Sequence, residues 1–337
     1  MMNMEYLIGN DFNGCVSIVE NGKTVYQKAF GFADRANEIP NQCSTRFAAA
    51  SAGKVFVAVG ILQLIEQKIL GFDDTLGSLL DIDWKKIDKA ITIRQLLCHT
   101  SGIPDYFDES TMHEYEELWK DYPNYKIRTS QDIIPLFIDK PMMYPAGQKF
   151  QYNNTGYVVL GLIIEKVKGE LFDSYLRKNI FEPCQMTDTG YYELDRLPAR
   201  CANSYILDPA NGEYYTNIYS VDVKGTGAGG VFTTVKDIDS FWTCLTEGKL
   251  LSKDMLQQMI APQCGTGTQY YGYGVWLTKE KENTFIPYFQ GSDPGVSFLT
   301  SYDPARRSGI TLVSNCGFNV WKLNRDIRRS AGDTCSS

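Results

Sequence analysis

The segment FAAASAGKVFVA, Phe47–Ala58, decides the fold of this chain, because it sets one serine and one lysine in an otherwise apolar run. Apolar residues continue at spacings of three and four to about Lys68, which predicts a helix beginning near Ser51. Residues three apart lie on one helix face, so the amine of Lys54 can reach the hydroxyl of Ser51. Burying both groups costs free energy, which favours a functional reason for them.

The pattern S-x-x-K suits nucleophilic catalysis. A free serine is a poor nucleophile and needs a neighbouring base. Lysine can serve if desolvation and positive potential lower its pKa from about 10.4 towards neutrality. A helix N-terminus supplies such potential, and its N–H groups can stabilise an oxyanion. The motif occurs by chance in many surface helices, so the prediction of Ser51 as nucleophile depends on the rest of the chain.

A second polar cluster is Tyr152-Asn153-Asn154. Beside a lysine ammonium the phenolate of Tyr152 is stabilised, which makes it a candidate proton shuttle. The amide of Asn154 can accept a hydrogen bond from Lys54 and donate one to a substrate carbonyl. Alternatively, Asn153 or Asn154 caps a helix, and both interpretations can hold together.

Both ends of the chain have strand patterns, and the middle is mostly helical. Asn21-Gly22 separates two β-rich runs, a strong hairpin signal. The expected strands are 15–19, 24–28, 272–277, 296–302 and 309–314, and the expected helices are 93–97, 133–138 and 155–168.

These patterns predict an α/β (α+β) fold. An antiparallel sheet built from both chain ends is flanked by helices and carries an inserted, mostly helical subdomain. The expected boundaries are 1–75 and 220–330 for the sheet domain, 76–219 for the helical subdomain and 331–337 for a tail.

Taken in order, the motifs resemble the serine β-lactamase and penicillin-binding-protein superfamily, in the branch of class C β-lactamases, D,D-peptidases and esterases. The resemblance covers about residues 14–316 and includes Leu96–Tyr106 and Gly227–Asp237. It implies a β-lactamase/transpeptidase-like fold and an acyl-enzyme on an amide, ester or β-lactam. By resemblance Ser51 is the nucleophile, Lys54 and Tyr152 share the roles of general base and general acid, and Asn154 orients the substrate.

The third motif of the superfamily, K-T-G or H-x-G, falls at Phe289-Gln290-Gly291. By resemblance the glycine lets substrate approach the strand, and the backbone N–H of Ser292 completes the oxyanion hole. Phe289 stands where a basic residue helps to hold a substrate carboxylate, and a one-residue shift would place Gln290 there.

The missing basic residue changes the expected substrate. A charge-assisted contact contributes about 1.5–3 kcal/mol, so penicillins and D-Ala-D-Ala peptides should bind roughly ten- to a hundredfold more weakly. Esters, amides and uncharged peptides gain in plausibility. A non-hydrolytic penicillin-binding or peptide-sensing module is the alternative function, and it predicts a stable acyl-enzyme or binding without turnover.

Composition excludes several other partners. The net charge of −7 over 337 residues comes with no basic run, which argues against nucleic acid. No segment approaches the roughly 20 apolar residues of a membrane span. With His99 and His113 as the two histidines, no imidazole metal site and no cofactor are expected. A small-molecule or peptide substrate is predicted, and the sequence does not indicate an oligomeric state.

Nine cysteines at wide spacings, without C-x-x-C, favour reduced thiols in a reducing compartment. The N-terminal residues lack a signal-peptide pattern, so a cytoplasmic location is expected, although a trimmed secreted chain would look the same. Cys98-His99 is interpreted as a buried thiol beside a loop histidine, not as a catalytic pair.

The run Gly225–Gly230 satisfies G-x-G-x-x-G, but no hydrophobic strand leads into it. We expect these glycines to let a loop pass close to the active site or the sheet. The following helix should begin at Thr234, where Thr234–Asp237 forms a capping box.

Overall fold

The fold is described from a computed structural model, which covers residues 4–9, 11–112, 114–281 and 283–330. The expected tail 331–337, with Cys335, and His113 lie outside the described residues. In the described part, no helix is long and apolar enough to span a membrane.

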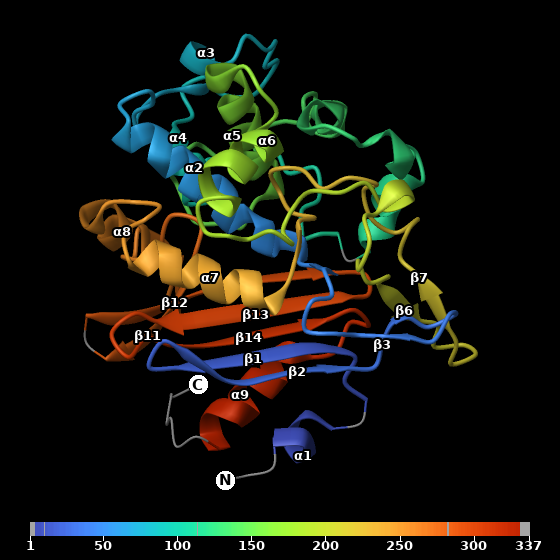
Figure 1. The fold of residues 1–337 in the computed structure, drawn as a ribbon. Coiled ribbons are helices and arrows are strands. Elements are labelled where there is room, and N and C mark those ends of the chain that lie inside the picture. Colours follow the sequence, from blue (N-terminus) through green and yellow to red (C-terminus); the bar gives the residue numbers. More distant parts are fainter. Residues whose placement is uncertain (1–3, 10, 113, 282, 331–337) are drawn as a thin grey trace.

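An eight-stranded antiparallel sheet forms the centre of the molecule (Figure 1). Its order is β2-β1-β14-β13-β12-β11-β10-β9, so strands from the two ends of the chain are neighbours. Gly14 of β1 pairs with Ser314 of β14. The strands are β1 Gly14–Glu20, β2 Lys23–Phe30, β9 Cys264–Thr266, β10 Gln269–Tyr271, β11 Trp276–Lys281, β12 Thr284–Asp293, β13 Val296–Asp303 and β14 Ser308–Ser314.

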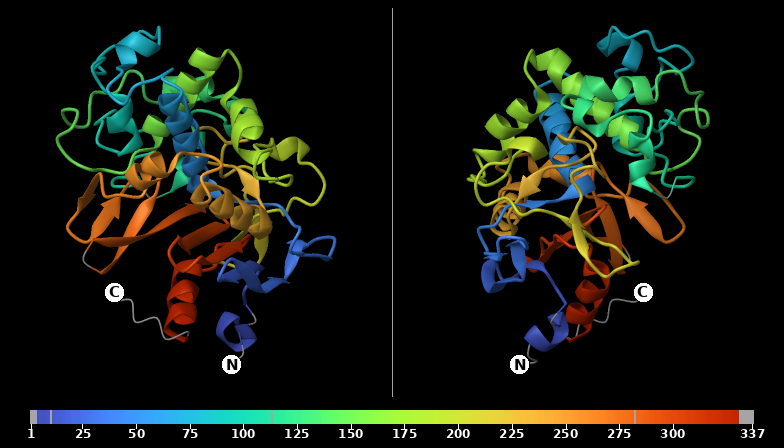
Figure 2. Two further views of the ribbon diagram at one scale, coloured as in Figure 1. Left: turned by 60° about the vertical axis from the view of Figure 1, so that its left-hand side comes forward. Right: turned by 90° about the vertical axis from the view of Figure 1, so that its right-hand side faces the viewer.

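Helices cover both faces of the sheet. In Figure 1 the helical region and α7 lie above the sheet, while α9 and α1 lie below it, and the views in Figure 2 keep this order. The helices are α1 Met4–Ile8, η1 Ala50–Gly53, α2 Lys54–Glu66, α3 Leu76–Leu79, α4 Ile93–Leu97, η2 Tyr115–Trp119, η3 Asn124–Lys126, η4 Ser130–Leu136, α5 Asn154–Lys168, α6 Phe172–Leu176, η5 Arg177–Phe181, η6 Leu194–Arg196, α7 Val235–Thr246, α8 Lys253–Met259 and α9 Val320–Ser330.

Short strand pairs connect the layers. They are β3 Phe32–Asp34 with β4 Ile39–Pro40, β5 Phe47–Ala48 with β8 Phe232–Thr233, and β6 Tyr205–Leu207 with β7 Tyr214–Thr216. The β5–β8 pair joins the segment before Ser51 to the segment before α7, and thereby holds the start of α2 against the sheet.

The predicted fold class is confirmed: an antiparallel sheet from both chain ends carries helices on both faces. The predicted hairpin forms with Asn21 and Gly22 both at positive φ, 51° and 74°, as a tight two-residue turn requires. The helix predicted to start at Thr234 begins there, because the Thr234 side chain accepts a hydrogen bond from the Asp237 N–H at 3.1 Å.

Two local expectations were wrong, and one helix was missed. The strand expected at 272–277 begins only at Trp276. The helix expected at 133–138 is a 3₁₀ segment, η4, with Pro135 inside it, and proline disfavours regular helix. Helix α9 was not expected at all; it covers the lower face with Val320, Leu323 and Ile327.

Candidate active site

The start of α2 is held in a strained turn. Ala50 has a φ of 48°, in the left-handed region that an alanine rarely adopts. The Ala49 N–H donates to the Val231 carbonyl at 2.8 Å, and the Gly230 N–H donates to the Ala50 carbonyl at 3.1 Å. These bonds position Ser51 in η1 at the head of a helix whose first three turns are buried.

Lys54 is 2% exposed and lies directly behind Ser51. Its Nζ is 2.9 Å from Ser51 Oγ and 2.8 Å from Asn154 Oδ1, and it also donates to the Ala228 carbonyl. Burial lowers the pKa of this amine to about 8, against the opposing effect of nearby carboxylates, Glu109 first among them. The amine can therefore lose its proton near neutral pH.

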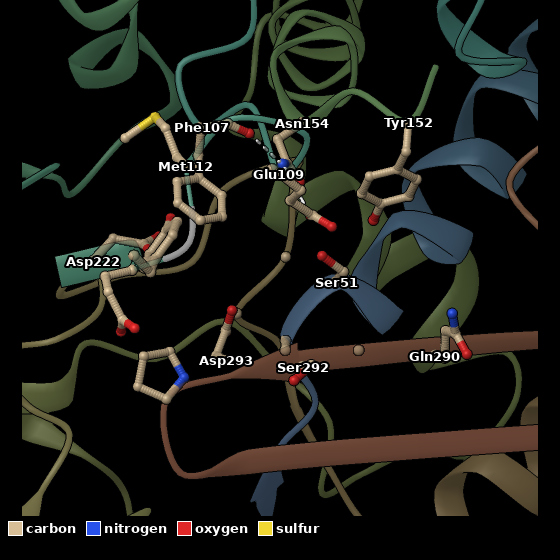
Figure 3. A pocket seen from close by; sticks show the side chains of 18 of the residues that line it. Ser51, Phe107, Glu109, Met112, Tyr152, Asn154, Asp222, Gln290, Ser292 and Asp293 are labelled. Carbon is tan, nitrogen blue, oxygen red and sulfur yellow. Dashed lines mark hydrogen bonds between the residues drawn. The ribbon is translucent and has the colours of Figure 1, made fainter. Parts of the chain in front are cut away.

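The phenol of Tyr152 points toward Ser51 (Figure 3). The Lys54 amine lies 4.9 Å from the centre of its ring. Burial raises the pKa of Tyr152 well above its ordinary value, while its hydrogen bond with Ser51 lowers it. Trp276 stacks on the ring, with centroids 5.9 Å apart, and shields it.

Asn154 begins α5 and connects three parts of the site. Its Oδ1 accepts from Lys54, and its Nδ2 donates to the Phe107 carbonyl at 3.2 Å and to Glu109 Oε1 at 3.4 Å. The preceding Asn153 caps the helix by accepting from the Gly156 N–H at 2.8 Å, so the predicted cap is confirmed.

Asp105 anchors the start of α5 and was not singled out in the sequence. Its carboxylate accepts from the N–H groups of Asn154 and Thr155 at 2.8 and 3.0 Å, and from the Thr155 hydroxyl. Burial raises the pKa of Asp105 to about 6, and these bonds oppose the rise. The helix that carries Asn154 is thus tied to the loop that carries Glu109.

Strand β12 passes directly under the Ser51 turn. A Cβ on Gly291 would lie 2.2 Å from the Ala49 carbonyl oxygen and 2.8 Å from the Ser51 nitrogen. The glycine therefore makes room for the turn itself, where the sequence had indicated an approaching substrate. Gln290 and Ser292 line the cleft with Gly291, and the Gln290 side chain accepts from Trp321 Nε1 at 2.7 Å.

The prediction that Phe289 lines the substrate site was wrong. Phe289 is 3% exposed and packs among aromatic rings at centroid distances of 5.1 Å (Trp242), 5.8 Å (Phe241) and 6.0 Å (Phe298). Side chains alternate along a strand, and this one points into the core between β12 and helices α2 and α7. Phe289 completes a hydrophobic core, and none of the described side chains that line the cleft is basic.

The glycine-rich run 225–230 lies between α5 and the Ser51 turn. A Cβ on Gly227 would be 2.2 Å from the Tyr157 carbonyl oxygen, and one on Gly229 would be 2.7 Å from the Ala50 carbonyl oxygen. The run thus passes close to the active site, as expected, and delivers the Ala228 carbonyl to Lys54.

His99 supports the site from behind. Its Nδ1 accepts from the Asn153 N–H at 3.1 Å, its Nε2 lies 3.1 Å from the Tyr271 hydroxyl, and its ring packs on Tyr152 with centroids 4.5 Å apart. Burial and the Lys54 charge hold its pKa well below 6.5, so the ring is neutral. It forms no pair with the thiol of Cys98, which is buried beside Cys264.

The cleft in front of Ser51 encloses about 740 Å³ and is lined by acidic residues that the sequence did not point out. They come from separate segments and share only their position around the cleft: Glu109, Glu114, Glu116, Asp222 and Asp293. No group of side chains among the described residues has the composition of a metal site.

Fold and site together define a serine hydrolase of the S-x-x-K class, in which a buried lysine contacts the serine hydroxyl. The sequence model of the Beta-lactamase family matches residues 11–332, and the chain belongs to this family. Accordingly, it acts on amides, esters or β-lactams through a serine.

Among similar proteins, penicillin-binding protein 4* of Bacillus subtilis is 30% identical over 91% of this chain and 68% of its own length. A teichoic acid D-alanine hydrolase of Staphylococcus aureus is 28% identical over 81% of this chain and 64% of its own length. A crystal structure of a penicillin-binding protein from Bacillus halodurans superposes with a TM-score of 0.93 and 35% identity, over 97% of this chain and all of that chain.

Proposed function

We propose that Ser51 is the nucleophile of an acyl-transfer reaction on an ester or amide. One observation carries this assignment: the Lys54 amine is buried, has a pKa lowered to about 8, and lies 2.9 Å from Ser51 Oγ. As a neutral amine it can accept the hydroxyl proton as Oγ bonds to the substrate carbonyl carbon.

Tyr152 is proposed to carry the proton onward. The phenol hydrogen-bonds Ser51 and lines the cleft. It can pass a proton to the leaving oxygen or nitrogen when the acyl-enzyme forms, and water then reverses the sequence to release the acid. Because Lys54 and Tyr152 both contact the hydroxyl, they titrate as a coupled pair.

The oxyanion is proposed to bind between the backbone N–H groups of Ser51 and Ser292. The close approach of Gly291 to the Ser51 nitrogen supports this, since it brings the two backbone segments together. Asn154, held by Lys54, is proposed to orient the acyl group by exchanging its 3.4 Å Nδ2 bond to Glu109 for one to the substrate.

The reaction is tested by covalent capture. An alkyl fluorophosphonate should add once to the protein and appear as a mass shift on the peptide that contains Ser51. Ser51→Ala should abolish the shift. Ser292→Ala is the matched control, because the proposed role of Ser292 uses only its backbone, and it should keep the adduct. An adduct that persists in Ser51→Ala would refute the assignment.

Substrate preference is tested with a panel of nitrocefin, a fluorescent penicillin, short-chain nitrophenyl esters and D-amino-acid amides. We expect turnover of the esters or amides and weak reaction with the two anionic β-lactams, because Phe289 stands in place of the motif's basic residue and no described side chain that lines the cleft is basic. Fast hydrolysis of nitrocefin with slow ester turnover would contradict this preference. A long-lived penicillin adduct without turnover of any substrate would instead support a sensing module.

We also propose a reducing compartment, and so the cytoplasm, as the location. The support is the sequence, which holds nine cysteines at wide spacings and no C-x-x-C. Fractionation of cells with an antibody to the chain tests this, and recovery in the medium or the wall fraction would refute it.

A further inference from the structure

The ionisable side chains that line the cleft are acidic. Five of its lining side chains are carboxylic acids, and among the lining residues that the structure describes none is a lysine, arginine or histidine. Lys54 touches the site from beneath, but its amine is taken up by Ser51, Asn154 and the Ala228 carbonyl. No described basic side chain is therefore available in the cleft to neutralise the acids.

Three of the acids already have partners. Glu116 accepts from the Ser220 hydroxyl, Asp222 from the Tyr115 hydroxyl at 3.2 Å, and Glu109 from the Asn154 amide at 3.4 Å. These bonds fix the direction of each carboxylate without supplying a positive charge.

Asp293 differs from the other three. Its side chain projects from the end of β12 into the cleft and faces Asp222 (Figure 3). Among the described residues it has neither a hydrogen-bond nor an ion-pair partner. Burial raises the pKa of Asp293 to about 8, and the neighbouring Asp222 contributes to the rise. A carboxylate in this position is stabilised by a cation close to it.

No described side chain supplies this cation, and an amine on the substrate can. A metal ion does not fit, because no described group of side chains has the composition of a metal site. A primary ammonium fits, since its three N–H donors can be shared between two carboxylates and the carbonyl groups around them. The presence of Phe289 in place of the motif's basic residue agrees with this, because no described basic group in the cleft can bind a substrate carboxylate.

We propose that Asp293, assisted by Asp222, binds a protonated amine on the substrate, so that this chain hydrolyses amino-bearing acyl esters or amides. The inference rests on the proposed function, because it names the substrate class of the same serine site. Asp293 and Asp222 are specificity-determining residues, and they take no part in proton transfer at Ser51.

The test compares matched nitrophenyl esters. Alanyl is paired with propionyl, and 6-aminohexanoyl with hexanoyl, and a succinyl ester adds a carboxylate. In at least one pair the ammonium ester should have a kcat/KM about ten- to a hundredfold above that of its uncharged twin. The succinyl ester should be the poorest substrate. Equal rates within both pairs, or preference for succinyl, would overturn the proposal.

Variants then locate the amine. In Asp293→Asn the preference ratio should fall about tenfold, mainly through a higher KM for the ammonium ester. Asp222→Asn should have a smaller effect of the same kind. Glu116→Gln removes one charge from the same cleft at an acid held by Ser220, and the preference should survive. An equal loss of the preference ratio in all three variants would show that the overall negative charge of the cleft causes the preference. That result would refute a binding site at Asp293.

The two proposals fail in different ways. If the fluorophosphonate does not label Ser51, the acyl-transfer assignment is wrong. If Ser51 is labelled and the esters turn over without regard to the amine, only the ammonium site is wrong.

Discussion

At the scale of single residues, the Lys54 amine sets the pH at which the site works. The centre of the Tyr152 ring lies 4.9 Å from it. Burial lowers the pKa of the amine, and the carboxyls of Glu109, Asp105, Asp293 and Asp222 raise it electrostatically against this effect. Only the neutral amine can accept a proton, and its pKa is about 8. With an uncharged ester, kcat/KM should rise about tenfold per pH unit below 8 and level off above it.

The control for this profile is Asp293→Asn, because the pKa of Asp293 is also about 8. If Lys54 is the titrating group, kcat/KM of the variant for an uncharged ester still rises with pH below 8 as in the unmodified protein. If the rise of kcat/KM below pH 8 disappears in the variant, the titrating group is Asp293. Lys54→Met should lose roughly a hundred- to ten-thousandfold in kcat at every pH.

Gly291 is a second residue on which the site depends. In Gly291→Ala the new methyl group would lie 2.2 Å from the Ala49 carbonyl, so the Ser51 turn must move. We expect kcat to fall about a hundredfold or more and stability to fall by about 1–3 kcal/mol. The control is Gly161→Ala on α5, where nothing lies closer than 3.4 Å. Full ester turnover by Gly291→Ala would contradict the proposed contact.

The sequence predicted part of this site. Ser51, Lys54, Tyr152 and Asn154 stand in recognisable local patterns, and the structure brings them together. Phe289 was wrong because a motif position does not reveal which way a side chain points. The acids were missed because Glu109, Asp222 and Asp293 lie on separate segments, and nothing in the chain links them before it folds.

At the scale of elements, helix α7 carries a buried acid onto the sheet. Asp239 accepts from the Ser17 hydroxyl of β1 at 2.6 Å and from the Thr311 hydroxyl of β14 at 3.5 Å. Burial raises its pKa to about 7, against the effect of these bonds. The folded state therefore holds this proton more tightly than the unfolded chain, whose Asp pKa is about 3.9.

The consequence is a pH-dependent stability. Between about pH 4 and 7 the folded state binds more protons at Asp239, so its contribution to the free energy of unfolding falls as the pH rises. Asp239→Asn should remove this slope and stabilise the protein at pH 8 by at most about 4 kcal/mol. Urea unfolding at pH 5 and 8 measures it, with the exposed Asp81→Asn as control. A variant that is less stable at pH 8 and keeps the slope would contradict the prediction.

Elements were predictable where their signals are local. The hairpin and helices α2, α5 and α7 have turn residues, apolar periodicity or caps within a few residues. Helix α9 was missed because it is polar overall and has only a narrow apolar face, formed by Val320, Leu323 and Ile327. Burial of this face against the sheet stabilises the helix, and the sequence alone does not show that contact.

At the scale of the whole molecule, six cysteines meet in three pairs from distant segments. Cys15 contacts Cys43, Cys98 contacts Cys264, and Cys184 contacts Cys244. With oxidised glutathione each pair should lose two hydrogens to the reagent, lowering the mass by about 2 Da per pair and raising Tm. Alkylation and peptide mapping test this, and Cys201 and Cys316 should still be alkylated. Mixed disulfides with glutathione on all the cysteines would contradict the pairing.

The pairing of Gly14 with Ser314 has a consequence for how the protein is made. Strand β14 lies between β13 and β1, so the N-terminal hairpin has no place in the sheet until the last strand leaves the ribosome. Folding that depends on such remote partners is slow, and the nascent chain waits with its apolar strands exposed. The active site therefore cannot assemble during translation. We expect chaperones to bind the nascent chain before the enzyme can bind a substrate.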